Sequence, residues 1–126
     1  MAGEFTASQR VSLDQAIRAA EQDCRFEFSV FVGTAEGEPR PFAERLHAAL
    51  STPARSVLIM VDPAAHVVEV VTGAEVRRYL GDREVALAVL DMQGEFAAGD
   101  LVRGLRRGIS MMGMSARAPR TLHAEA

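Results

Sequence analysis

Charged side chains stand near the ends of the predicted strands, where they could do chemistry. Asp62 ends the apolar run SVLIMVD, and it fits either an active-site acid or the first residue of a turn. Arg77 and Arg78 are adjacent in the segment VVTGAEVRRYLGD. Arginine forms bidentate hydrogen bonds with phosphate and carboxylate groups, so this pair is a candidate contact for an anion or a protein partner. Pairing with carboxylates nearby in the sequence is the alternative.

Other charged residues have a structural interpretation beside a functional one. Glu69 interrupts the valines of VVEVVT, so it is either an acid on a helix-covered face or a residue on the partly wet face of an edge strand. Asp82 and Asp100 each precede a helical pattern and fit the N-cap position, and Asp82 is also a candidate site acid. Arg103, Arg106 and Arg107 follow one helix face, as a solvated face or a contact for an acidic partner requires.

Several classes of site are excluded by the sequence. No nucleophile elbow, P-loop or dinucleotide-binding glycine pattern occurs. Cys24 is the only cysteine, so an intrachain disulfide and a cysteine-rich zinc site are both impossible. His47, His66 and His123 lie far apart and lack the spacing of metal ligands.

The composition is that of an ordinary soluble domain. The 126 residues are 48% hydrophobic and 25% charged, and a chain of this length is most simply one domain. The net charge of −3 gives no field that favours nucleic acid or an anionic membrane, so we expect neither as a partner. The start MAGEFTASQR has no signal-peptide pattern, and the apolar runs are shorter than the ~20 residues of a membrane span. We therefore expect a cytoplasmic protein, as a monomer or homodimer.

Hydrophobic periodicity predicts the elements that position these residues. Helices are expected over 11–24, 41–50, 74–80, 82–96 and 100–112, and strands over 26–32, 56–62 and 67–72. Ser12 and Gln15 fit a capping box for the first helix. Gly104 and Gly108 lie one turn apart inside the last helix, which favours close approach to a neighbouring element.

The order of these elements predicts an α/β fold. The first two strands, joined through a helix, form a parallel βαβ unit, and the second and third form an antiparallel hairpin. The result is a three-layer α/β/α sandwich with a small mixed sheet and helices on both faces. We divide the chain into an N-terminal segment (1–10), the domain (11–113) and a mobile C-terminal tail (114–126).

The domain also resembles a known family in the order of its short segments. FEFSVFV, SVLIMVD, VVEVVTG, the LGD of residues 80–82 and AAGDLVRGLRRGI are similar to the pattern of the TPM domain, which is named for thylakoid lumen, photosystem repair and receptor-modulator proteins. The resemblance covers 11–113 and is to short, uncharacterised proteins of high-GC actinobacteria. It implies an α/β/α sandwich.

The TPM resemblance also implies a chemistry. Some members of that family are described as acid phosphatases, and a calcium or other divalent ion is associated with their acidic residues. By this resemblance Asp62, Asp82 and Glu69 would hold Ca²⁺ or Mg²⁺, which would activate water against a phosphomonoester. The family's glycine-rich loop carries a central acid, and Arg77 stands at that position here. A guanidinium group there would repel a divalent ion by several kcal/mol in a partly dry site.

Two functions follow as hypotheses. The favoured one is a non-catalytic module for protein interaction or assembly, with an unknown protein partner and no cofactor, because the central acid is replaced by arginine. The alternative is the divalent-metal-dependent acid phosphatase that the resemblance implies.

Overall fold

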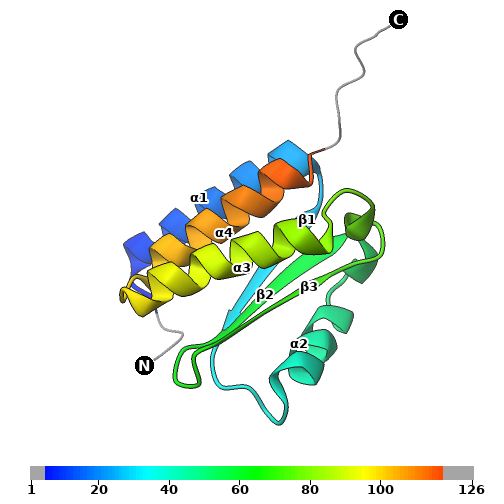
Figure 1. Cartoon of the computed structure of the whole chain (residues 1–126). Helices are drawn as coiled ribbons and strands as arrows, with labels where there is room; N and C mark the ends of the chain where they lie inside the picture. The colour runs from blue at the N-terminus through cyan, green and yellow to red at the C-terminus, as the bar shows by residue number, and fades with distance from the viewer. Residues whose placement is uncertain (1–4, 118–126) are drawn as a thin grey trace, which may run out of the picture.

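The structure is a computed structural model that describes residues 5–117. Its elements are α1 (Ala7–Cys24), β1 (Glu27–Val32), α2 (Pro39–Ala48), the 3₁₀ turn η1 (Pro53–Arg55), β2 (Ser56–Asp62), β3 (Val67–Thr72), the 3₁₀ turn η2 (Val76–Arg78), α3 (Asp82–Ala97) and α4 (Leu101–Ser115). The strands form one sheet, which α2 covers on one face and α1, α4 and α3 cover on the other (Figure 1). The predicted α/β sandwich is confirmed.

The sheet has the order β1-β2-β3. β1 runs parallel to β2, from the pair Glu27–Ser56 to the pair Val32–Val61, and β2 runs antiparallel to β3. The predicted βαβ unit and hairpin are therefore correct. Both β1 and β3 are edge strands, while every residue of β2 is buried.

β2 is the centre of two hydrophobic clusters, one on each face of the sheet. Its side chains alternate, as a strand requires. Ile59 and its same-face neighbours pack under the large helix layer, against buried residues of α4 such as Leu105 and Ile109. Leu58 and Met60 point the other way, into the smaller cluster beneath α2. The unbroken apolar run of β2 is explained by this double covering.

The first helix begins earlier than the sequence analysis predicts. α1 starts at Ala7, and Thr6 and Gln9 form its capping box: the Gln9 N–H donates to Thr6 Oγ1 (3.1 Å), and the Thr6 N–H donates to Gln9 Oε1 (2.9 Å). The prediction of a cap at Ser12 was wrong, and the segment 1–10 contains part of the helix. TASQ has the same capping pattern as SLDQ, but the apolar stripe that guided the prediction begins later.

Two other helix starts differ from the prediction. α2 begins at Pro39 instead of Pro41, since either proline fits a first turn. Gly81 is the N-cap of α3, and Asp82 is the first helical residue, with no side-chain capping bond. The predicted cap at Asp82 was wrong, although its charge still suits the positive end of the helix dipole.

Three further boundaries complete the comparison. The predicted helix over 74–80 is only a 3₁₀ turn, η2. The cap of α4 is confirmed, because the Arg103 N–H donates to Asp100 Oδ1 (3.0 Å). α4 continues to Ser115, and residues 118–126 of the predicted tail lie outside the described residues.

Glycines let α4 approach both of its neighbours, as the sequence predicts. A Cβ on Gly104 would lie 2.4 Å from Phe96 Cε1 of α3, and one on Gly108 would lie 2.4 Å from Met92 Sδ. On the other side, a Cβ on Gly113 would lie 2.8 Å from Ala20 Cβ of α1. α4 is thereby packed between α1 and α3 (Figure 1). Among residues 5–117, no helix is long and apolar enough to cross a membrane.

The cost of filling this contact can be measured with a pair of glycine variants. Gly108→Ala should lower the free energy of unfolding by about 1–3 kcal/mol, because the methyl group overlaps the fully buried Met92. Gly94→Ala, at a helical position with open space around it, should instead raise it by about 1 kcal/mol. Guanidinium denaturation of both variants checks this. Equal effects of the two substitutions would show that α4 does not need the close approach.

Candidate functional site

Asp62 holds two loops in place. It ends β2 and is only 5% exposed. Its Oδ2 accepts a hydrogen bond from the Ala35 N–H (3.0 Å), and its Oδ1 accepts one from the Ala65 N–H (3.2 Å). The second bond is the turn-starting contact that an aspartate before proline makes. These contacts account for the burial of this carboxylate without a ligand.

The three carboxylates of the metal hypothesis lie apart. Glu69 lies within β3 and is 3.3 Å from Arg40 Nη1. Asp62 is paired with Val67 at the start of β3, whereas Asp82 begins α3 beyond the far end of that strand. A six-residue strand spans on the order of 17–20 Å. Within residues 5–117, no three His, Cys, Asp or Glu side chains form a group that could hold a metal ion.

The two adjacent arginines have separate environments. The Arg77 guanidinium group turns back and donates to the Thr72 carbonyl at the end of β3. Arg78 is exposed on the same 3₁₀ turn. Glu75, one of the carboxylates nearby in the sequence that could have paired with these arginines, instead forms an ion pair with Arg55 (2.8 Å). The structure therefore does not bring Arg77 and Arg78 together as one anion site.

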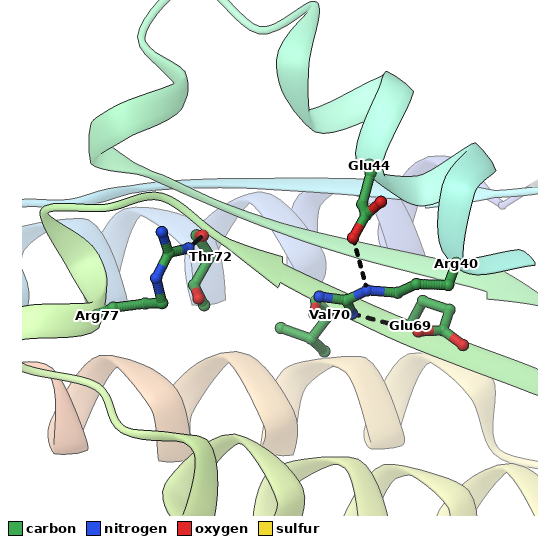
Figure 2. Close-up of polar contacts among 6 residues, drawn as sticks. All are labelled: Arg40, Glu44, Glu69, Val70, Thr72 and Arg77. Atoms are coloured by element: carbon green, nitrogen blue, oxygen red, sulfur yellow. Dashed lines mark hydrogen bonds and ion pairs between the residues drawn. The ribbon is translucent and has the colours of Figure 1, made fainter.

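Arg40 of α2, like Arg77, donates to a backbone carbonyl of β3, a contact that the sequence analysis missed. Its Nη1 donates to the Val70 carbonyl (2.7 Å), and its guanidinium group lies 3.3 Å from both Glu44 and Glu69. Figure 2 shows Arg40 and Arg77 reaching β3 at two points along the strand. Nothing in the local sequence could have indicated the contact with Val70, because the partners are 30 residues apart.

These two arginines cover the outer edge of β3 at two of its three outward residues. Successive residues of a strand point their backbone groups to alternate edges. The Gly73 N–H donates to the Ser56 carbonyl of β2 (2.9 Å), so the groups of Val68, Val70 and Thr72 point away from the sheet. Of these outward carbonyls, those of Val70 and Thr72 accept from Arg40 and Arg77. An added strand would have to displace both guanidinium groups.

The other edge of the sheet lacks such closure. The Gly33 N–H donates to the Val61 carbonyl (2.9 Å), so Phe28, Val30 and Val32 present their backbone groups outward. The Phe28 N–H donates to Glu21 Oε2 of α1 (3.0 Å). Within residues 5–117, no side chain forms a hydrogen bond with the outward N–H or carbonyl groups of Val30 and Val32. We call these two residues and their backbone groups the open edge.

An apolar hollow lies beside the open edge. It has a volume of about 440 Å³ and lies between β1 on one side and α1, together with Phe5 just before the helix cap, on the other. Its lining is Phe5, Arg10, Leu13, Asp14, Ile17, Val30, Phe31 and Val32. A hollow of about 420 Å³ lies correspondingly between β3, the β2–β3 turn and α3 with the loop that follows it. Within residues 5–117, the hollow beside β1 adjoins the unpaired backbone of two residues, Val30 and Val32, whereas the hollow beside β3 adjoins that of Val68 alone.

The arginine face of α4 borders a wider groove of about 900 Å³ against α1. Arg107 turns toward α3, where its Nε and Nη2 lie 2.6 and 2.9 Å from the carboxylate oxygens of Asp91. Arg103 of α4 lies 3.3 Å from Glu95, which also belongs to α3. Since Asp23 and Asp100 also line the groove, its positive charge is offset, and an acidic partner is not specially favoured there.

The ion pair between Asp91 and Arg107 makes the stability of the fold depend on pH. The hydrogen bond from Arg107 holds the pKa of Asp91 below its ordinary value. The ionised carboxylate therefore stabilises the fold above the unfolded pKa of about 3.9, and this is lost as pH falls through the lower folded value. Asp91→Asn should lower the free energy of unfolding at pH 7, and this loss should become smaller below about pH 4. Urea denaturation at both pH values checks this, with Asp23→Asn as control; an effect independent of pH contradicts it.

Removing the closure of β3 should open this edge to an added strand. The double variant Arg40→Ala/Arg77→Ala frees the outward carbonyls of β3, and an exposed edge pairs readily with another chain. We expect a blocked peptide of alternating Thr and Val to slow hydrogen exchange at the outward amides of Val68 and Val70 in this variant, and not in the wild type. Arg78→Ala/Arg106→Ala removes the same charge from exposed positions and is the control. Identical behaviour of both double variants would refute the closure.

Known proteins are similar to this chain in sequence. The uncharacterised protein Rv2468c of Mycobacterium tuberculosis strain H37Rv is 28% identical over 108 residues, which are 86% of this chain and 65% of that protein. MT2543 of strain CDC 1551 matches to the same extent. The chain thus spans less than two thirds of the length of these relatives.

Solved structures of lower identity have the same fold. The BA42 protein of the psychrophilic bacterium Bizionia argentinensis has a TM-score of 0.79 at 23% identity, over 90% of this chain and 82% of that one. The N-terminal domain of the cg2496 protein of Corynebacterium glutamicum has a TM-score of 0.76 at 13% identity, over 98% and 81%. At these identities the likeness is one of fold alone.

The predicted membership of the TPM domain family is wrong. Residues 2–113 match a different family, whose description is "Domain of unknown function (DUF5130)". The segments that suggested the resemblance are apolar strands, a glycine after a strand and aspartates at helix starts, which many helix-covered sheets require. The metal and phosphatase expectations came with that resemblance and lose its support. The match covers nearly the whole domain, and the chain belongs to the DUF5130 family.

Proposed function

We propose that this chain is a non-catalytic protein-interaction module that binds an extended segment of a partner along β1. The observation that carries the proposal is the open edge: the backbone groups of Val30 and Val32 face away from β2 and adjoin an apolar hollow. Strand addition uses main-chain hydrogen bonds for affinity and side-chain pockets for specificity. β1 and α1 offer both within one surface.

The contrast between the two edges supports this assignment. Native proteins protect edge strands with charged side chains, because an exposed edge is a template for pairing. Arg40 and Arg77 provide such protection at β3, at two successive outward carbonyls. On β1 the only such bond within residues 5–117 is the one from Phe28 to Glu21, at the beginning of the strand. The fold therefore leaves one edge available for a partner.

This function requires no cofactor and no metal. The alternative, a divalent-metal acid phosphatase, would need Asp62, Glu69 and Asp82 in one place, and they lie on different parts of the sheet and helix layer. No observation favours it as a second candidate. A cytoplasmic location and a monomeric or homodimeric state stay predictions.

Selection from a phage-displayed library of random dodecapeptides on the immobilised protein tests the proposal. Val30→Pro removes an outward N–H, and proline is tolerated at such an edge position because the bonds to β2 are made by the neighbouring residues. Selected peptides should bind Val30→Pro at least about tenfold more weakly than wild type, a loss of about 1.4 kcal/mol. Val68→Pro, at an outward position of β3, is the matched control and should bind normally.

A second measurement avoids any effect of proline on folding. In the wild-type protein, bound peptide should slow hydrogen exchange at the outward amides of Val30 and Val32, because they become hydrogen-bonded. The amides of Val68 and Val70 should be unchanged. Selected peptides that protect neither β1 amide, or a library that yields no binder, would overturn the proposed function.

A further inference from the structure

We infer that the segment bound at the open edge is a single strand without its own covering helix, such as a flexible tail or linker, and not the edge of another folded sheet. A second copy of this chain paired antiparallel through β1 is excluded for the same reason. The inference rests on the proposed function and specifies the kind of partner. It follows from how far α1 extends beyond β1.

The helix layer is wider than the sheet beneath it. α1, α4 and α3 lie side by side with α4 in the middle, over three strands (Figure 1). Packed helix axes are about 8–10 Å apart, whereas neighbouring strands are about 4.8 Å apart. The outer helix axes therefore lie about 3–5 Å beyond the outer strands, and the helices themselves reach further. α1 overhangs the open edge as a roof.

The two hollows confirm this geometry. The one beside β1 is lined by residues of α1, such as Leu13 and Ile17, together with Val30 and Val32 of the strand. The one beside β3 is lined by Phe96 of α3 together with strand and turn residues. Space of this kind, bounded by a helix above and a strand at the side, arises where a helix extends past the sheet.

The overhang of α1 leaves room for one added strand, but not for a sheet whose own helix covers its edge on the same face. A strand hydrogen-bonded to β1 lies about 4.8 Å outward, under α1 and in the hollow. If the added strand were β1 of another copy in antiparallel pairing, the opposed outward residues would carry their side chains on the same face, and that copy's α1 would overhang the same line from the other side. The two helices would then meet closer than the 8 Å that helix packing requires. A lone segment meets no such obstacle.

The surroundings also set the pattern of the segment. Side chains that point toward α1 enter a hollow with Phe5, Leu13 and Ile17 in its lining, so alternate residues of the segment should be apolar. Arg10 and Asp14 stand among the lining residues, so the hollow also offers one charge of each sign. On the opposite face, α2 packs against β2 and β3, and β1 is less covered. The remaining alternate residues should therefore be polar.

Two synthetic heptapeptides of equal composition test the pattern. One alternates Thr and Val, and the other places its three valines consecutively; both are blocked at their ends. In an NMR titration of the full chain, the alternating peptide should shift the amides of Val30 and Val32 at a concentration at least about tenfold below that of the other. Equal shifts by both peptides would overturn the alternating pattern.

Filling the roof tests its part in binding. Ile17→Trp occupies the hollow and should weaken the alternating peptide at least about tenfold. Ala19→Trp adds the same ring to the opposite groove, between α1 and α4, and should not change binding. Thermal unfolding of both variants verifies that they are folded. Unchanged binding to Ile17→Trp would overturn the inference.

Sedimentation equilibrium separates this inference from the proposed function. The wild-type protein alone should show no self-association that Val30→Pro removes. A dimer abolished by Val30→Pro would overturn the inference while leaving an interaction module. Faster exchange at Val30 and Val32 after deletion of residues 1–4 or 118–126 would identify the chain's own end as the occupant and would also overturn it. Failure of the library selection, in contrast, would remove the proposed function itself.

Discussion

The close approach of α4 to its two neighbours is the contact on which the rest of the structure depends. Gly104 and Gly108 bring α4 against α3, and Gly113 brings it against α1. Because α4 then lies over the middle of a three-stranded sheet, the outer helices come to lie over the strand edges. The hollows under α1 and α3 follow from this one packing arrangement.

The two edges differ because different elements reach them. α2 packs on β2 and β3, which brings Arg40 to the Val70 carbonyl, and the turn after β3 brings Arg77 to the Thr72 carbonyl. β1 has no neighbouring element on its outer side in residues 5–117 except α1, which contributes Glu21 at the beginning of the strand. An asymmetric placement of α2 thus leaves one side of the sheet available for binding.

Local sequence patterns predicted most of the fold, but they did not predict the contacts between residues far apart in the sequence. The burial of β2 on both faces, the cap at Asp100 and the close approach at Gly108 depend on neighbouring residues, so the sequence reveals them. The contact of Arg40 with Val70 depends on the placement of α2. Likewise, the alternation of β1 is the same whether its outer side is open or paired, so the sequence could not identify the open edge.

The two arginines that cover the edge of β3 bind its backbone and not its side chains. Arg40 and Arg77 bind carbonyl oxygens, which every amino acid presents. Substitutions at Val70 or Thr72 that keep the strand therefore leave the acceptors in place. The closure therefore depends on the two donors. A change at residue 40 or 77 would expose the outer border of β3 and give the protein two accessible sheet borders instead of one.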